Sequence, residues 1–233
     1  MRCLVVLPTY NESENLSAII ENIQRHLPAA HILVVDDDSP DGTGALADDL
    51  SAQQPKNIFV LHRDRKDGLG RAYVEGFKFA LGADYDVVVQ MDADFSHDPE
   101  YLPVFLEEIN RNDLVIGSRY LKGISVVNWD LKRLILSKAA TNYVRFITRM
   151  PLTDTTSGFK CWRREALEQI DLEKVFSNGY LFQIETSYIA VRRKLRVIEI
   201  PIVFEERRLG RSKMHWGIIA EALWGVVRLR LKS

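Results

Sequence analysis

The sequence has little cysteine and no cysteine pattern that builds a site. Its 233 residues contain two cysteines, Cys3 and Cys161, which lie far apart and outside any Cys-x-x-Cys or Cys/His ligand spacing. This scarcity excludes the disulfide framework that stabilises small secreted domains. A reduced, cytoplasmic setting fits the composition best, and neither thiol is assigned a function.

Long apolar runs are also absent. The N-terminal apolar stretch is interrupted by Pro8 and is too short and wrongly flanked for a signal peptide, so we interpret it as a buried strand. The most apolar C-terminal stretch, residues 216–231, is broken by Glu221, Arg228 and Arg230, whereas a simple span needs about 20 apolar residues. We therefore expect no unaided membrane crossing.

An excess of one charge sign is lacking as well. The chain has 31 Lys and Arg against 32 Asp and Glu, a formal net charge of −1, so any electrostatic attraction to a partner has to be local. Internal repeats, low-complexity segments and linkers are missing too. The chain is expected to be a single domain over 1–233, with a core over about 1–210 and a terminal amphipathic helix over about 214–232.

The chain does contain a regular alternation of short apolar runs and helical spacing. The expected strands are 3–7, 32–35, 58–61, 86–90 and 114–118, and the expected helices between them are 12–27, 44–51, 71–81 and 99–110. This alternation predicts an α/β protein with a mainly parallel central sheet flanked by helices. Ligands bind such sheets beyond the carboxyl ends of the strands, so the loops after Leu7, Val35, Leu61 and Gln90 are expected to gather into one site.

Positive charge is concentrated in two segments. Residues 119–149 carry seven basic side chains against the single acid Asp130, and the chain from residue 207 onward carries seven against the single acid Glu221. Apolar residues at helical spacing predict two basic amphipathic helices here, over 131–147 and 216–231. Such helices either lie in a membrane interface or pack their apolar stripe on the protein's own core, and both alternatives stay open.

Two carboxylates one residue apart follow the expected strand at 86–90. Asp92 and Asp94 flank Ala93, and at a strand end both can turn toward the same divalent cation. Hard oxygen ligands suit Mg²⁺ or Mn²⁺, which keep coordination positions open for phosphate oxygens. A solvated acidic loop is the alternative, and the position directly after a run of valines favours the metal site.

The segment 36–43 places four carboxylates where the second expected strand ends. Its second half has strong turn chemistry. A turn does not explain Asp36 and Asp37, because unpaired acids at the exit of a buried strand repel each other unless a cation or a donor-rich ligand lies there. Further along, Gly68 and Gly70 precede a helix without the full dinucleotide-binding spacing, so we favour a glycine turn that lets backbone approach a ligand.

Seven motifs, taken in order, resemble the inverting family-2 glycosyltransferases. They are residues 8–12 (PTYNE), 35–43 (VDDDSPDGT), 66–73 (KDGLGRAY), 91–97 (MDADFSH), 117–120 (GSRY), 154–160 (DTTSGFK) and 207–213 (RRLGRSK). The last three narrow the resemblance to the catalytic domain of dolichyl-phosphate, or polyprenyl-phosphate, mannose synthases. The resemblance runs nearly end to end and implies a GT-A fold that binds a nucleotide sugar.

The resemblance implies roles for residues at the matching positions. Asp92 and Asp94 would hold the metal on the donor diphosphate, and Ser96 stands where the family often has Gln, which leaves coordination there to water. The residues that would bind the donor are Pro8, Tyr10, Glu12, Asp37, Lys66, Asp92, Ala93, Asp94, Arg207 and Lys213. Those that would bind the acceptor phosphate are Arg119, Arg133 and Ser137. The catalytic set would be Asp92, Asp94, Arg119 and Arg133.

The implied reaction is transfer of mannose from GDP-mannose to a polyprenyl phosphate with inversion. An acceptor phosphate is already anionic at neutral pH, so no strong general base is needed, and arginines would position it by forked hydrogen bonds. A lipid acceptor implies peripheral association with the cytosolic face of a membrane, through the two basic helices and with or without a separate membrane-anchoring partner.

Several alternatives stay open at this point. Another nucleotide sugar, such as UDP-glucose, would use the same motifs. A non-catalytic nucleotide- or RNA-binding module would use the basic segments, but these lack the interleaved aromatic residues of RNA-binding modules, so no nucleic acid partner is expected. His97 either contacts phosphate or fixes its loop, and Asp154 and Glu185 either hold sugar hydroxyls or satisfy buried arginines.

Overall fold

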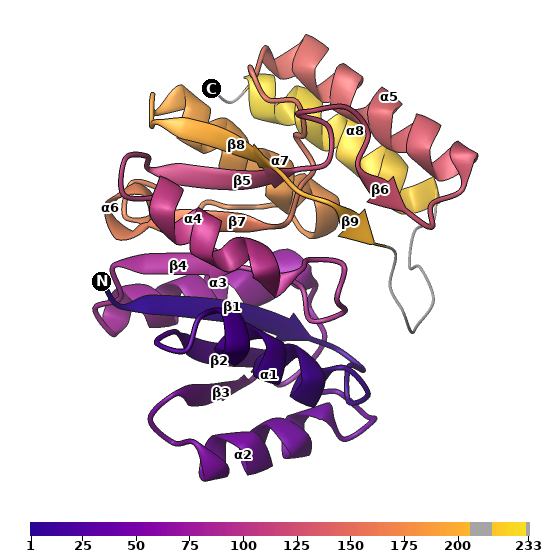
Figure 1. The fold of residues 1–233 in the computed structure, drawn as a ribbon. Coiled ribbons are helices and arrows are strands. Elements are labelled where there is room, and N and C mark those ends of the chain that lie inside the picture. Colours follow the sequence, from indigo (N-terminus) through magenta and orange to yellow (C-terminus); the bar gives the residue numbers. More distant parts are fainter. Residues whose placement is uncertain (206–215, 232–233) are drawn as a thin grey trace.

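Strands and helices alternate through the first half of the chain in the structure, a computed structural model that describes residues 1–205 and 216–231. The elements in order are β1 (Cys3–Thr9), α1 (Leu16–His26), β2 (His31–Asp36), α2 (Thr43–Gln53), β3 (Ile58–His62), α3 (Leu69–Gly82) and β4 (Val87–Gln90). These four strands pair in parallel in the spatial order β3-β2-β1-β4 (Figure 1). β1 and β4 are buried along their whole length, which explains their unbroken apolar sequences.

The second half of the chain extends the same sheet and adds a pair of helices beside it. Its elements are η1 (Pro99–Tyr101), α4 (Leu102–Glu108), β5 (Leu114–Ser118), β6 (Val126–Val127), α5 (Leu131–Thr148), β7 (Lys160–Arg163), α6 (Arg164–Leu167), α7 (Gly179–Arg192), β8 (Val197–Pro201), β9 (Phe204–Glu205) and α8 (Trp216–Leu231). The full sheet order is β3-β2-β1-β4-β7-β5-β8, and β6 pairs separately with β9. β7 runs antiparallel to both of its neighbours.

Two hydrophobic cores lie on the two faces of the sheet. Along β1, Leu4 and Val6 belong to one core, and Val5 and Leu7 belong to the other, as the alternation of side chains in a strand requires. The first core includes residues of α3, α7, α5 and α8, and the second includes residues of α1, α2 and α4. At Gly76 of α3 the helix approaches the sheet so closely that a Cβ would lie 2.4 Å from Val6 Cγ1.

The α/β class, the mainly parallel sheet and its flanking helices are therefore confirmed. Each expected strand and helix is present, with ends that differ by a few residues from the expected ones. The antiparallel strand β7 is not among the expected elements. Both cysteines are buried free thiols, and burial raises the pKa of Cys3 to about 12, which keeps that thiol protonated.

The two basic helices α5 and α8 lie side by side at one end of the molecule (Figure 1). They run in the same direction, because Tyr143 donates to the main-chain oxygen of Leu223 at 3.0 Å and Ile147 lies near Val227 four residues later. Their facing sides pack together, but Phe146 is 82% exposed and Leu231 is 78% exposed. Within residues 1–205 and 216–231, no helix combines the length and the apolar character that crossing a membrane requires.

Candidate active site

A cavity of about 850 Å³ lies beyond the carboxyl ends of the parallel strands. The loops after β1, β2, β3 and β4 all contribute to it, as expected, and α5, α7 and α8 form its far wall. The predicted site residues that line it are Pro8, Tyr10, Glu12, Asp37, Lys66, Asp92, Ala93, Asp94, Arg119, Arg133 and Ser137. The two remaining predictions, Arg207 and Lys213, lie outside the described residues.

The acids that follow β2 have partners within the protein. Asp36 accepts hydrogen bonds from Thr9 Oγ1 at 2.8 Å and from Ser39 Oγ at 2.6 Å, so its carboxylate shapes the loop. Asp37 forms an ion pair with Arg63 and lines the cavity. Burial raises the pKa of Asp37, although Arg63 opposes this effect. The interpretation of Asp36 and Asp37 as unpaired acids is therefore wrong, and of the two only Asp37 faces the cavity.

A cation and a ring meet at the β1–β2 end of the cavity. The Nζ atom of Lys66 lies 3.7 Å from the centre of the Tyr10 ring, so the loop after β3 packs on the loop after β1. The main-chain N–H of Glu12 donates to Thr43 Oγ1 at 3.0 Å, which ties the start of α2 to the same wall. Gly68 has a φ of +93°, a conformation that glycine adopts without strain, and it lines the cavity at the start of α3.

The two acids after β4 are held by neighbouring hydroxyl groups. Asp92 Oδ1 accepts from the Tyr73 hydroxyl at 2.9 Å, and Asp94 Oδ1 accepts from Ser96 Oγ at 2.6 Å. Phe95, which follows Asp94, has a left-handed φ of 62°, which tightens the turn. Hydrogen bonds of this kind orient carboxylates as metal ligands, so the pair fits a divalent cation. Among the described residues no group of three or more His, Cys, Asp or Glu side chains could hold a metal ion.

His97 fixes the loop that carries Asp92. Its Nδ1 accepts the main-chain N–H of Asp92 at 3.0 Å, so the ring proton lies on Nε2. The ring stacks on Phe159 with 4.9 Å between centroids, and its burial lowers the pKa of His97. The side chain also lines the cavity. Of the two predicted roles, the structure supports the loop-fixing role, through a neutral imidazole.

Arg119 is buried and held by a carboxylate. Its Nε and Nη2 atoms each lie 2.6 Å from an oxygen of Asp154, and Nη2 also donates to Thr156 Oγ1 at 2.7 Å. Asp154 raises the pKa of Arg119, and Arg119 holds the pKa of Asp154 below its usual value against the effect of burial. The fork expected to hold a phosphate is thus occupied by Asp154, and among the described residues Nη1 makes no hydrogen bond.

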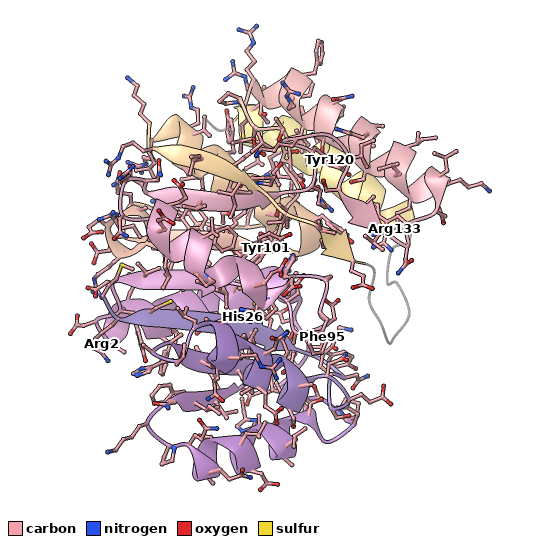
Figure 2. The ribbon with its side chains drawn as sticks, in the orientation of Figure 1. Arg2, His26, Phe95, Tyr101, Tyr120 and Arg133 are labelled. Atoms are coloured by element: carbon pink, nitrogen blue, oxygen red, sulfur yellow. The ribbon has the colours of Figure 1, made fainter. Side chains whose placement is uncertain are left out.

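Arg133 and Ser137 lie on the first turns of α5. Figure 2 shows Arg133 at the end of that helix nearest β9. The guanidinium of Arg133 lies 4.3 Å from the centre of the Trp129 ring, and Ser137 Oγ accepts from the Tyr120 hydroxyl at 2.7 Å. Asp130 caps the helix by accepting the main-chain N–H of Arg133 at 2.7 Å. The structure therefore brings Arg133 and Ser137 to the part of the cavity wall that α5 forms.

The two uncertain acids do not reach the cavity. Asp154 satisfies Arg119, and Glu185 accepts the main-chain N–H of Ser177 at 3.1 Å. Sequence reasoning missed Gln183, which lies two residues before Glu185 and does line the cavity. That Gln183 faces the cavity can be predicted only once residues 179–192 are known to form a helix, because the helical periodicity decides which side chains point toward the site.

Residues 4–171 match the family described as glycosyl transferase family 2, and they make up most of the chain. The chain belongs to this family. This confirms the predicted family.

Relatives of this glycosyltransferase cover nearly the whole chain. It is 49% identical over 231 residues to the polyprenol monophosphomannose synthase of Mycolicibacterium smegmatis, an alignment that covers 97% of this chain and 87% of the relative. It is 46% identical over 233 residues to the undecaprenyl-phosphate mannosyltransferase of Micrococcus luteus, covering 100% and 96%. It is 38% identical to the dolichol-phosphate mannosyltransferase of Pyrococcus furiosus, covering 98% of this chain and 64% of that protein.

Solved structures of the glucosyl-3-phosphoglycerate synthase from Mycobacterium tuberculosis share the fold of this glycosyltransferase. The complex with Mn²⁺, UDP-glucose and phosphoglyceric acid has a TM-score of 0.71 at 18% identity and covers 99% of this chain and 79% of that one. The complex with Mn²⁺, UDP and glucosyl-3-phosphoglycerate has a TM-score of 0.70 at 17% identity, with the same coverage. This likeness confirms the predicted GT-A fold.

Proposed function

We propose that this glycosyltransferase transfers mannose from GDP-mannose to a polyprenyl phosphate, with inversion and with Mg²⁺ or Mn²⁺ as cofactor. The observation that supports this function best is the composition of one cavity. Its lining combines a carboxylate pair, two arginines and an apolar wall of side chains from α5 and α8. The names of the relatives agree, since each one describes a transferase or synthase that acts on a polyprenyl-type phosphate and mannose.

The proposed metal would be held by Asp92 and Asp94. When bound, a divalent cation neutralises charge that develops on the diphosphate of a leaving nucleotide. Tyr73 and Ser96 keep the two carboxylates in place through the hydrogen bonds described above. Pro8, Tyr10, Glu12, Asp37 and Lys66 form the nucleoside end of the cavity in this proposal, and Arg207 and Lys213 would add contacts to phosphate.

The acceptor phosphate would lie at Arg119 and Arg133. Arg119 offers Nη1, because Asp154 and Thr156 use its other donors, and Ser137 lies on the turn of α5 that follows Arg133. A phosphate oxygen attacks C1 of mannose, the bond between C1 and the donor diphosphate breaks, and GDP leaves with the bonding electrons. Attack opposite to the leaving group inverts C1, and the anionic phosphate needs no base to activate it.

The prenyl chain would follow the apolar wall of the cavity. This wall is made by side chains of α5 and α8 that lie at helical spacing, namely Leu136, Ala140, Tyr143, Val144, Leu223 and Val226. The wall starts beside Ser137 and continues toward the ends of both helices. Burial of each CH₂ group contributes about 0.8 kcal/mol, so such a wall suits a long hydrocarbon acceptor.

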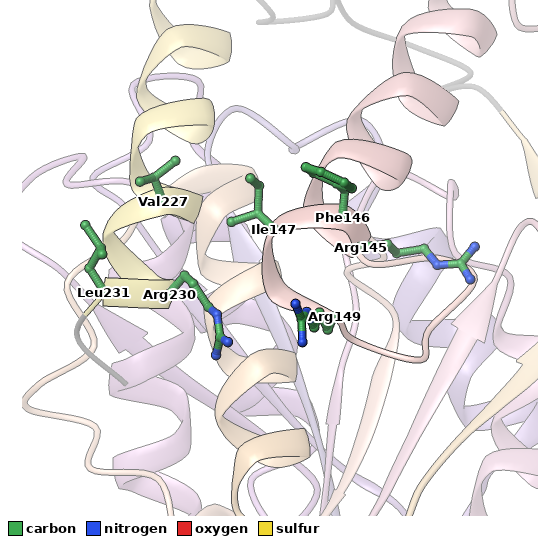
Figure 3. Close-up of a pocket in the computed structure, with 7 residues that line it drawn as sticks. All are labelled: Arg145, Phe146, Ile147, Arg149, Val227, Arg230 and Leu231. Carbon is green, nitrogen blue, oxygen red and sulfur yellow. The ribbon is translucent and has the colours of Figure 1, made fainter.

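The ends of the same two helices would contact the membrane. Figure 3 shows a pocket here in which Ile147 faces α8 while Arg149 and Arg230 lie at the helix ends; its residues are Arg145, Phe146, Ile147, Arg149, Val227, Arg230 and Leu231. Exposed Phe146 and Leu231 beside three arginines suit an interface between acyl chains and anionic headgroups. We place the enzyme at the cytosolic face of the membrane as a peripheral protein, with or without a separate anchoring partner.

A transfer assay tests the proposed function. Labelled GDP-mannose and UDP-glucose are each offered with detergent-solubilised polyprenyl phosphate and Mg²⁺ or Mn²⁺, and label is followed into the lipid phase. Label is expected from GDP-mannose only, and transfer from UDP-glucose instead would change the donor in this proposal. Absence of transfer from either donor by folded enzyme refutes it.

A matched pair of variants tests the metal role in the same assay. Asp94→Asn removes one ligand charge and is expected to lower transfer at least 100-fold, since charge stabilisation in an active site contributes about 2.7–4 kcal/mol. Asp49→Asn makes the same change on the exposed face of α2 and is expected to leave transfer unchanged. Full turnover by Asp94→Asn at saturating metal would contradict the assignment.

A further inference from the structure

Gln183 is a buried side chain with an unused donor. It lies in α7, is 3% exposed and lines the cavity. Among the described residues its Nε2 atom has no hydrogen-bond partner. A buried amide N–H without an acceptor is unfavourable and rare in folded proteins, so this N–H group indicates an acceptor that a bound ligand supplies.

The direction of the Gln183 amide follows from a chain of neighbours. The indole Nε1 of Trp162 can only donate, and it lies 3.4 Å from Gln90 Oε1. Gln90 therefore presents its Nε2 to Gln183 and donates to Gln183 Oε1. With its oxygen engaged in this way, Gln183 leaves its Nε2 for the cavity.

The amide lies beside the loop that carries the proposed metal ligands. Gln90 ends β4, directly before that loop. A Cβ on Gly158 would lie 3.3 Å from Gln183 Nε2 and 3.3 Å from His97 Cε1. His97 in turn binds the main chain of Asp92. Gln183, Gly158 and His97 thus meet at one place on the cavity wall, where the missing side chain of glycine keeps space open.

The same place adjoins the acceptor side of the cavity. Gly158 follows the segment in which Asp154 and Thr156 hold Arg119. In the proposed reaction the sugar has to lie between the diphosphate and the acceptor phosphate, because its C1 changes partners from one to the other. Gln183 therefore faces the part of the cavity that the sugar would occupy.

We propose that Gln183 Nε2 donates a hydrogen bond to a hydroxyl of the donor sugar and so acts as a positioning and specificity residue. This inference rests on the proposed function and assigns to Gln183 the recognition of a sugar hydroxyl. A site built to pair with a hydroxyl rejects an analogue that lacks it, because its own buried donor is then left unpaired. Gln183 would therefore contribute to selection of the sugar as well as to its placement.

A one-atom change tests the inference. Gln183→Glu keeps the oxygen that accepts from Gln90 and replaces the donor by an acceptor. With GDP-mannose its kcat is expected to fall about 10–100-fold, while its affinity for GDP, which has no sugar, stays within about 2-fold of wild type. The decisive readout uses GDP-mannose analogues that each lack one sugar hydroxyl. One analogue is expected to slow the wild-type enzyme about 10–100-fold and to cause no further loss in Gln183→Glu.

Two further variants control for effects on folding. Tyr188→Phe removes the other buried unpaired polar group of α7, which does not line the cavity, and it is expected to keep wild-type kinetics. Gln183→Met fills a similar volume without a charge and replaces Gln183→Glu if the latter does not fold. Equal sensitivity of wild type and variant to every analogue overturns this inference alone. A folded wild-type enzyme that transfers no mannose overturns the proposed function together with it.

Discussion

Buried charged residues in this protein differ in how they are neutralised. Arg119 and Asp154 form a two-bond ion pair, and the side chain of Asp154 is 0% exposed. Lys160 is also fully buried, yet it donates to two neutral oxygens, the main-chain O of Gln183 at 2.7 Å and Thr186 Oγ1 at 3.0 Å. Both arrangements predict that stability rises with pH, but over different pH ranges.

Asp154→Asn is expected to lower the free energy of unfolding by about 3–5 kcal/mol, because it leaves the Arg119 charge buried without a partner. The folded-state pKa of Asp154 is below its usual value, so its contribution is complete above about pH 4 and is lost as pH falls through that lowered pKa. Urea unfolding at several pH values measures both effects. Asp48→Asn, which removes the exposed partner of His62, is the control and is expected to change stability much less. A loss in Asp154→Asn no larger than in this control would contradict the prediction.

Lys160→Met is expected to remove a rise of stability with pH. Burial lowers the pKa of Lys160 well below its usual value of 10.5, so the unfolded chain binds a proton that the folded chain does not. Stability therefore increases with pH between the lowered pKa and about 10.5, by at most about 1.4 kcal/mol per pH unit. Guanidinium unfolding at pH 7 and pH 9 compares the variant with exposed Lys56→Met, which is expected to keep the wild-type slope. An unchanged slope in Lys160→Met would show that Lys160 is charged in the folded protein.

At the scale of elements, the parallel part of the sheet could be predicted because its strands are unbroken apolar runs. The antiparallel β7 could not, since its sequence Lys160-Cys161-Trp162-Arg163 has two basic residues in four, and only its neighbours β4 and β5 make it a strand. The same limit applied within the site. The motif loops were correctly predicted to lie together, because parallel strands end at one edge of the sheet. The pairing of Asp154 with a buried arginine was one of two alternatives, and the sequence could not decide between them because no pattern gives the path of residues 149–159.

The α5–α8 pair could be predicted as two amphipathic helices but not as a pair. Val144 and Val226 are buried, so part of the apolar stripes packs on the protein's own core, as one alternative expected. Phe146 and Leu231 are exposed, and contact of these side chains with a membrane stays a prediction. We expect Phe146→Asp combined with Leu231→Asp to reduce binding to vesicles of anionic lipid at least 10-fold in a sedimentation assay, because apolar surface is replaced by charge that the headgroups repel.

The control for this pair is Val104→Asp, which changes an exposed apolar residue of α4, on the other face of the sheet. It is expected to bind vesicles as wild type does. The double variant should still transfer sugar to a short, water-soluble prenyl phosphate, since neither of its residues lines the cavity. Equal vesicle binding by the double variant and the control would place the membrane contact elsewhere.

For the molecule as a whole, the cavity connects segments that are far apart along the chain. Its walls come from residues 8–12, from the loop after β4, and from α5, α7 and α8, so a ligand that fills it links both halves of the sheet. A ligand that binds only the folded state stabilises it by about 2.7 kcal/mol at 100 times its dissociation constant. In a chain of 233 residues this corresponds to an increase in Tm of about 5–10 °C.

GDP together with Mn²⁺ is therefore expected to raise Tm by about 5–10 °C, whereas GDP with a chelator has a smaller effect, because the proposed contact between Asp92, Asp94 and the diphosphate passes through the metal. Differential scanning calorimetry measures both shifts without any turnover. In Asp94→Asn the metal-dependent part should disappear while the metal-independent part remains, since contacts at the nucleoside end do not involve Asp94. If GDP raised the Tm of the wild-type protein equally with and without the cation, Asp92 and Asp94 would not hold the nucleotide through a metal. The proposed reaction would then have to be written without a metal ion.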